Sequence, residues 1–282
     1  MVRRRLSDEP VSRLAIWARR LAVFAFVASV LSIIIVRSGL LEIVPALATF
    51  GGALVLAVLA IVLAFAAFVV IWRDGLDGLG MAVGALCIGL ALLAYPVYLG
   101  IKAYRLPAIY DITTDPIDPP KFEAVARIRP REGTNAVTYA GLYTAEQQRT
   151  AYPDIEPMLV SVSPQIAYEA VTAVINRRKW RPITDRPPLA GRRDGFIEMV
   201  VRTPIMGFRD DVLVRIRPNA QGARIDFRSA SRYGRHDLGT NAARVRGLIE
   251  DVDDAIDELT TEKKPVPTTK AQAPAKGAPA KR

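Results

Sequence analysis

Three arginines lie in one short stretch near the C-terminal end of the chain, at Arg228, Arg232 and Arg235, just before an expected helix. A guanidinium binds a phosphate or carboxylate through parallel N–H donors. The free amides at the start of that helix, near Asp237 and Asn241, would add positive potential. These five residues therefore predict a site for an anion, supplied by an anionic lipid, a cell-wall polymer or a partner protein.

The chain before these arginines alternates between apolar and charged residues, through 211–217 and again through 224–232. Such alternation predicts two strands, joined by a turn at 218–223. One face of the pair carries valine, isoleucine and phenylalanine, and the other carries aspartate and arginine. In this register Arg215 lies opposite Asp226, as a cross-strand pair of opposite charge.

Carboxylates on the same face make a second interpretation of the arginines necessary. Asp210 and Asp211 lie at the start of the first strand, with Asp211 diagonal to Arg228. Arginine outnumbers lysine 20 to 2 in residues 111–262, and planar bidentate pairing requires arginine. The charges are therefore predicted to be held in fixed geometry. Whether the arginines bind an external anion or these internal carboxylates stays open.

A catalytic interpretation uses the same stretch of chain. Ser229 or Ser231 would be the nucleophile and His236 its base, oriented by an aspartate, in a hydrolase acting on an envelope lipid or polymer. The alternation places both serines on the face of Phe227, which is the expected core side, and no nucleophile-elbow turn exposes them. Binding or scaffolding is preferred to catalysis, and no catalytic residue is predicted.

No metal or cofactor site is predicted either. The chain has one histidine and one cysteine, and Cys87 lies in an apolar segment far from His236, which excludes a cluster of His and Cys ligands. Asp111, Asp115 and Asp118 are the remaining candidates, but their spacing is not that of a calcium-binding loop.

The elements that would position these residues form an α+β domain. Ser163 and Pro164 predict the start of a helix that ends near Lys179. Three strands are expected at 196–203, 211–217 and 224–232, and a final helix at 241–259. Both helices have one apolar face, so we expect them to cover one side of an antiparallel sheet.

Three long apolar segments precede this domain, at 15–36, 45–72 and 79–101. Each is long enough to span a bilayer as a helix, and the only charges inside them are Arg19 and Arg20, near the start of the first segment. An ionisable residue at mid-membrane is the usual mark of an ion or proton path. Because these segments have none, they predict a membrane anchor with three transmembrane helices.

The distribution of charge predicts how the anchor is oriented. Residues 1–20 contain six arginines and two acidic residues, whereas the loop after the first segment has Arg37 beside Glu42. By the positive-inside rule the N-terminus stays in the cytoplasm. Three crossings then place the C-terminal domain in the periplasm, so the chain is predicted to be a multi-pass protein of a bacterial inner membrane.

The predicted domain organisation is an anchor at 1–101, a proline-rich linker at 102–122, the α+β domain at 123–262 and a Pro/Ala/Lys tail at 263–282 that we expect to be disordered. The net charge of +10 resides mainly at the two ends, because residues 111–262 contain 22 basic and 23 acidic residues. A nearly neutral domain argues against nucleic acid as a partner.

The third apolar segment carries a stripe of small residues, Gly80, Gly84, Cys87 and Ala91. Such a stripe lets two helices approach closely. Two interpretations stay open: packing inside the three-helix bundle, or a homodimer formed through this segment.

The sequence motifs also resemble a known family. Residues 226–244 read DFRSASRYGRHDLGTNAAR, and upstream lie DITTD at 111–115, a proline pair at 119–120 and a further stretch from Thr203 to Asp211. Together these motifs resemble the domain-of-unknown-function family 1499, over about residues 108–260. The resemblance implies a membrane-attached or exported protein and implies no activity. His236 stands where the family pattern leads us to expect serine.

Overall fold

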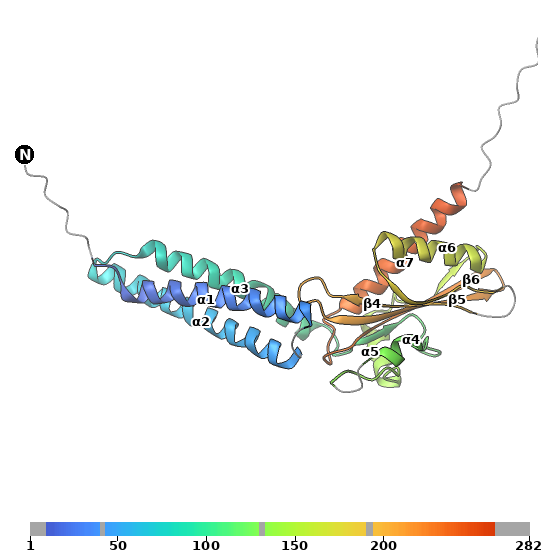
Figure 1. Cartoon of the computed structure of the whole chain (residues 1–282), viewed down its shortest axis with the longest axis horizontal. Coiled ribbons are helices and arrows are strands. Elements are labelled where there is room, and N and C mark those ends of the chain that lie inside the picture. Colours follow the sequence, from blue (N-terminus) through green and yellow to red (C-terminus); the bar gives the residue numbers. More distant parts are fainter. Residues whose placement is uncertain (1–9, 40–42, 130–132, 190–193, 263–282) are drawn as a thin grey trace, which may run out of the picture.

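In the computed structural model, a bundle of three long helices continues into an α+β domain (Figure 1). The structure describes residues 10–39, 43–129, 133–189 and 194–262; the tail predicted at 263–282 lies outside them. The helices of the bundle are α1 (Arg13–Ser38), α2 (Ile43–Asp74) and α3 (Leu79–Arg105). Each is long and apolar enough to cross a membrane, which agrees with the three predicted segments.

Small residues form the interior of this bundle. The buried seam contains Ala15, Ala18, Ala22, Ala60, Ala64, Ala67, Ala82 and Ala85. Gly89 of α3 packs against α2 so closely that an added Cβ would lie 2.6 Å from Cγ1 of Ile61. Large apolar side chains cover the outside, as expected of helices that face lipid.

The stripe of small residues on α3 does not contribute to this seam. An added Cβ at Gly80 or Gly84 would have nothing within 4 Å, and Cys87 is exposed. Packing inside the bundle is therefore the wrong interpretation for these three residues. A homodimer through α3 stays a prediction.

The domain is built on a six-stranded antiparallel sheet with the order β1-β6-β5-β4-β3, and β2 pairs with β6 near its start. The strands are β1 (Asp111–Thr113), β2 (Met158–Val160), β3 (Pro182–Arg186), β4 (Gly195–Arg202), β5 (Arg209–Asn219) and β6 (Gly222–Ser231). The three predicted strands correspond to β4, β5 and β6. Arg215 lies opposite Asp226, as the alternation predicted.

The segment predicted as a linker at 102–122 contains the end of one helix and a short strand. Residues 102–105 continue α3, and Asp111–Thr113 form β1. β1 pairs with β6, so that Thr113 lies opposite Arg228. The sheet therefore begins before the boundary predicted at residue 123. The short distance along the chain from α3 to β1 places the domain directly at the end of the bundle (Figure 1).

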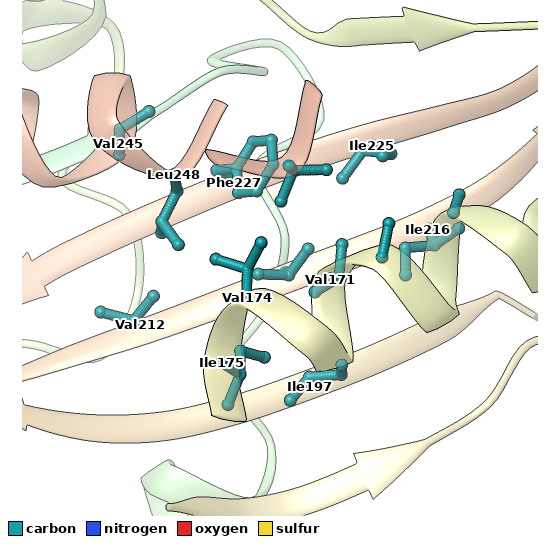
Figure 2. Close-up of a cluster of buried hydrophobic side chains, with 14 of the residues drawn as sticks. Val171, Val174, Ile175, Ile197, Val212, Ile216, Ile225, Phe227, Val245 and Leu248 are labelled. Atoms are coloured by element: carbon teal, nitrogen blue, oxygen red, sulfur yellow. The ribbon is translucent and has the colours of Figure 1, made fainter. Parts of the chain in front are cut away.

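One face of the sheet carries the main apolar core. α6 (Pro164–Arg177) and α7 (Thr240–Glu262) cover this face, as predicted for the two amphipathic helices. Figure 2 shows Val174 of α6 and Leu248 of α7 among side chains of the strands, including the fully buried Phe227. Burial of such apolar surface is the main favourable term for this part of the fold.

The opposite face of the sheet is covered by the chain between β1 and β2, including α4 (Ala124–Ile128) and α5 (Leu142–Ala151). Its apolar cluster is small, consisting of Phe122, Val125, Leu213 and Ala230. Glu198 of β4 is buried and accepts the backbone N–H groups of residues 123–125, which fixes the start of α4. The ion pairs on this face join arginine to buried aspartate.

Candidate functional site

Arg228 is buried inside the domain, where its guanidinium donates to groups of the chain itself. Its guanidinium donates to both carboxylate oxygens of Asp111, from Nε at 3.0 Å and from Nη2 at 2.7 Å. It also donates to the carbonyl of Pro120 and lies over the rings of Phe122 and Tyr139, with its Cζ 4.6 and 5.6 Å from the centroids. Because Arg228 is only 1 % exposed, it has no free face for an external anion.

Arg232 is likewise paired with an internal carboxylate. Its Nε donates to Oδ1 of Asp211 at 2.8 Å, and Arg129 approaches Oδ2 of the same carboxylate at 3.2 Å. All three side chains are buried. Burial raises the pKa of Asp211, against the opposing effect of Arg232, and burial lowers the pKa of Arg129.

The predicted pair of Arg215 and Asp226 belongs to a larger ion cluster, formed by three arginines and three aspartates: Arg215, Arg217, Arg224, Asp115, Asp118 and Asp226. Asp226 is completely buried and accepts from all three arginines, at 2.8 to 3.0 Å. Asp115 and Asp118 reach the cluster from the chain after β1. Both carboxylates are therefore paired with arginine.

Asp237 and Asn241 stabilise the start of α7. The Asp237 carboxylate accepts the backbone N–H of Gly239 at 2.9 Å and of Asn241 at 2.8 Å. The side-chain amide of Asn241 donates to the carbonyl of Tyr110 and to the hydroxyl of Ser231. Burial raises the pKa of Asp237, and its two backbone hydrogen bonds oppose that shift. These helix amides are occupied by the chain's own carboxylate.

The serines of the catalytic interpretation are buried in a polar cluster. Ser229 is completely buried, donates to Asn241 and accepts from Arg244, whose guanidinium also donates to Asp210 at 2.6 Å. His236 instead contacts the carbonyl of Ala103 at the end of α3, at 3.2 Å. Among the described residues no hydrogen bond joins His236 to a serine. The arrangement gives no support to a hydrolase.

Of the five residues predicted to hold an anion, only Arg235 has an exposed charge with no partner in the described part of the chain. The structure thus corresponds to the internal-network interpretation for Arg228 and Arg232. Asp210 and Asp211 belong to that network as well, through Arg244 and Arg232.

Three arginines that the sequence did not single out gather at the junction between the bundle and the domain. Arg37 at the end of α1, Arg202 at the end of β4 and Arg209 at the start of β5 line an open cavity of about 560 Å³. Arg37 donates to the carbonyl of Ile205 at 2.9 Å, and Arg202 donates to the carbonyl of Arg37 at 2.6 Å. A volume of this size is typical of small-molecule sites.

The electrostatics of this cavity differ from those of the sheet interior. Arg202 and Arg209 are direct cross-strand neighbours, and like charges in that position repel. No carboxylate of the described residues lies within 4.0 Å of either guanidinium or of Arg37. The one feature of the sequence that could have predicted this cluster is the strand register. The end of one predicted strand and the start of the next place Arg202 and Arg209 side by side.

Comparisons with known proteins give a family, through one family model, and no activity. No protein with curated annotation is detectably similar in sequence. A crystal structure of a Rhodobacter sphaeroides protein is 12% identical, with a TM-score of 0.23; the match covers 38% of this chain and 91% of that chain. A TM-score this low does not establish a shared fold.

A protein family described as "Protein of unknown function (DUF1499)" matches residues 111–252. The match begins at the first residue of β1 and includes every strand and the first half of α7. It contains the ion cluster, the Arg228–Asp111 pair and the capped start of α7, whereas the three long helices lie before it. The chain therefore belongs to the DUF1499 family.

Proposed function

We propose that this protein is an integral protein of a bacterial inner membrane whose periplasmic domain binds an anionic ligand of the cell envelope. Support for the membrane location comes from the three long apolar helices and from the exposed apolar surface of the bundle. Arg13, Arg19 and Arg20 lie at the end of the bundle away from the domain, which supports a cytoplasmic position for that end.

The observation that carries the binding role is the uneven use of arginine in the domain. Buried carboxylates pair with Arg215, Arg228, Arg232 and Arg244. Arg202, Arg209 and Arg235 are exposed and have no carboxylate partner among the described residues. All three belong to the end of the domain that faces the bundle, where they would meet an anion at the membrane surface.

The experiment is to identify what the full chain retains. Protein solubilised from membranes in mild detergent is analysed by mass spectrometry for lipids, envelope polymers and proteins. We expect an anionic molecule to co-purify with the wild type and to be lost from a triple variant, Arg202→Gln, Arg209→Gln and Arg235→Gln.

A matched control for this experiment is Arg177→Gln. Arg177 is an exposed arginine on α6, remote in sequence from the junction, and its pair with Glu258 is a surface salt bridge of little energetic weight. Equal retention by the wild type, the triple variant and the control would contradict the proposed function.

A further inference from the structure

The junction cavity has a cationic wall that is well supplied with unused donors. A guanidinium carries five N–H donors. Arg37 uses Nη1 for two backbone carbonyls, Arg202 uses Nη1 for one, and the guanidinium of Arg209 makes no hydrogen bond within the described chain. The remaining donors and three positive charges are available to an anion in the cavity.

The geometry of the β4–β5 turn keeps this wall in place. Gly207 has a φ of +70°, and an added Cβ there would lie 3.0 Å from Cγ of Arg37. The turn is closed by Thr203, which accepts the N–H of Gly207 through its carbonyl and that of Phe208 through its hydroxyl. Arg37 therefore packs against this turn and donates to two of its carbonyls. Arg202 and Arg209 lie at the ends of the two strands that the turn joins.

A second part of the cavity lining is apolar and belongs to the helices of the bundle. It consists of Val36 at the end of α1 and Ile43, Val44 and Leu47 at the start of α2. Val44 is 78% exposed and Leu47 is 39% exposed. Because both lie in the first turns of a membrane-length helix, this wall continues along α2 into the apolar surface of the bundle.

We propose that the cavity binds one anionic phospholipid, with its phosphate held by Arg202, Arg209 and Arg37 and its acyl chains lying along the first turns of α2. This inference rests on the membrane location in the proposed function and names the ligand class for that site. A diester phosphate presents two oxygens to guanidinium forks. The apolar wall contacts the hydrocarbon part of the same molecule.

The two walls together select this ligand over the other envelope anions. A polymer phosphate or an acidic protein would satisfy the arginines but would leave Val44 and Leu47 exposed beside it. A zwitterionic lipid would fill the apolar wall but would bring no net charge to three guanidiniums. Only an anionic lipid matches both the charge and the apolar surface.

The test measures lipid retention by the full chain in detergent. The chain is incubated with mixed micelles containing phosphatidylglycerol or phosphatidylcholine with the same acyl chains, and bound lipid is counted by native mass spectrometry. We expect one phosphatidylglycerol per chain. Loss of two charge-assisted contacts in the double variant Arg202→Gln, Arg209→Gln should weaken retention about tenfold or more, and Arg177→Gln should retain lipid as the wild type does.

Two further measurements test the binding mode. The first asks whether the bound phosphate belongs to a lipid or is free, and the second asks whether positive charge alone is enough or the guanidinium fork is needed. Inorganic phosphate in large excess should leave the bound phosphatidylglycerol in place, because it gains nothing from the apolar wall. Displacement by inorganic phosphate would overturn the lipid assignment. Arg209→Lys keeps the charge but not the guanidinium fork, so we expect retention between those of the wild type and the double variant.

Both arginines are exposed and outside the apolar core, so the variants should fold, which an unchanged melting midpoint will verify. Unchanged phosphatidylglycerol retention in a folded double variant would overturn this inference. The proposed function would then still be decided separately, by whether the chain retains another anionic envelope molecule through the same arginines. If neither a lipid nor any other anion is retained, both proposals fail.

Discussion

Asp226 is the residue on which the ion cluster depends most. Its carboxylate is completely buried and accepts hydrogen bonds from Arg215, Arg217 and Arg224. Removing one partner of a buried ion pair leaves an uncompensated charge and typically costs about 3–5 kcal/mol. We therefore expect Asp226→Ala to lower the melting midpoint of the domain in the full chain sharply, as measured by near-UV circular dichroism in detergent.

Arg235 and Arg232 provide the matched comparison for Asp226→Ala. Arg235 is exposed without a described partner, so Arg235→Ala should change stability by no more than about 0.5 kcal/mol. Arg232 is 3% exposed and pairs with Asp211, so Arg232→Ala should behave like Asp226→Ala. Small, equal effects at all three positions would show that the charged face is simply solvated.

The buried aspartates also give the domain an expected response to pH. Burial raises the pKa of Asp111, Asp210, Asp211 and Asp237, although arginines or backbone amides oppose the shift. A carboxyl whose folded pKa exceeds its unfolded value of about 3.9 binds protons more tightly in the native state. Its stabilising contribution is fully present below the unfolded pKa and is lost as pH rises through the folded pKa.

We accordingly expect the melting midpoint at pH 5 to equal or exceed that at pH 7.5. Asp118 acts in the opposite sense, because Arg215 and Arg217 outweigh its slight burial and lower its pKa; its contribution is lost only below about pH 4. Melting curves of the full chain across this range provide the measurement. A steep fall of the midpoint between pH 7.5 and 5 would contradict the expectation.

At the residue scale, the alternation along two strands predicted one ion pair but not the carboxylates from distant parts of the chain that also contact the arginines. Arg215 opposite Asp226 follows from the register of two adjacent strands. Asp115 and Asp118 lie about a hundred positions before Arg215 in the chain, and Asp111 lies 117 positions before Arg228. No periodicity connects residues so far apart, so the sequence left open which carboxylates each arginine would meet.

At the scale of elements, length decided what could be predicted. β5 and β6 have 11 and 10 residues, enough for a clear alternation, and α7 has 23 residues with a continuous apolar face. β1 and β2 have three residues each, and α4 has five. Such short elements carry no periodic signal of their own, because pairing with β6 and capping by Glu198 define them.

A glycine in the β5–β6 hairpin allows the hairpin to approach β2 closely. Gly222 has a φ of +146°, and an added Cβ would lie 2.3 Å from the carbonyl oxygen of Val160. Gly222→Ala should therefore destabilise the domain by the backbone strain of about 1–3 kcal/mol and by the additional clash with β2. Chemical denaturation of the full chain in detergent would measure the loss.

Gly141→Ala separates these two contributions. Gly141 also has a positive φ, of +87°, but an added Cβ there would have nothing within 4 Å. Gly141→Ala should therefore lower the free energy of unfolding only by the backbone strain at positive φ. If Gly141→Ala and Gly222→Ala were equally destabilising, the close approach of β2 to the hairpin would not contribute.

At the scale of the whole molecule, the bundle and the domain are joined at two places. α3 leads within a few residues into β1, and His236 contacts the carbonyl of Ala103 at its end. Arg37 of α1 contacts the β4–β5 turn, 167 and 168 positions further along the chain. The sequence predicted the bundle and the domain separately. The second contact joins the end of a helix to a turn between strands far away in the chain, and no periodic pattern connects the two.

This arrangement makes a specific prediction about topology. The ends of α1 and α3 and the start of α2 all lie on the side of the domain, and the opposite ends lie together at the far side (Figure 1). Arg13, Arg19 and Arg20 are on the far side, in or next to the first turns of α1. If that side is cytoplasmic, as the positive-inside rule favours, three crossings place the domain in the periplasm.

Reporter fusions after Glu262 measure which side the domain occupies. We expect alkaline phosphatase fused there to be active, and a fluorescent protein that matures only in the cytoplasm to be dark. A fusion after Asp74, at the far end of α2, should give the reverse pattern, because two crossings return the chain to the cytoplasm. An inactive phosphatase and a bright fluorescent protein after Glu262 would show that the domain is cytoplasmic. The junction cavity would then face the lipids of the cytoplasmic leaflet.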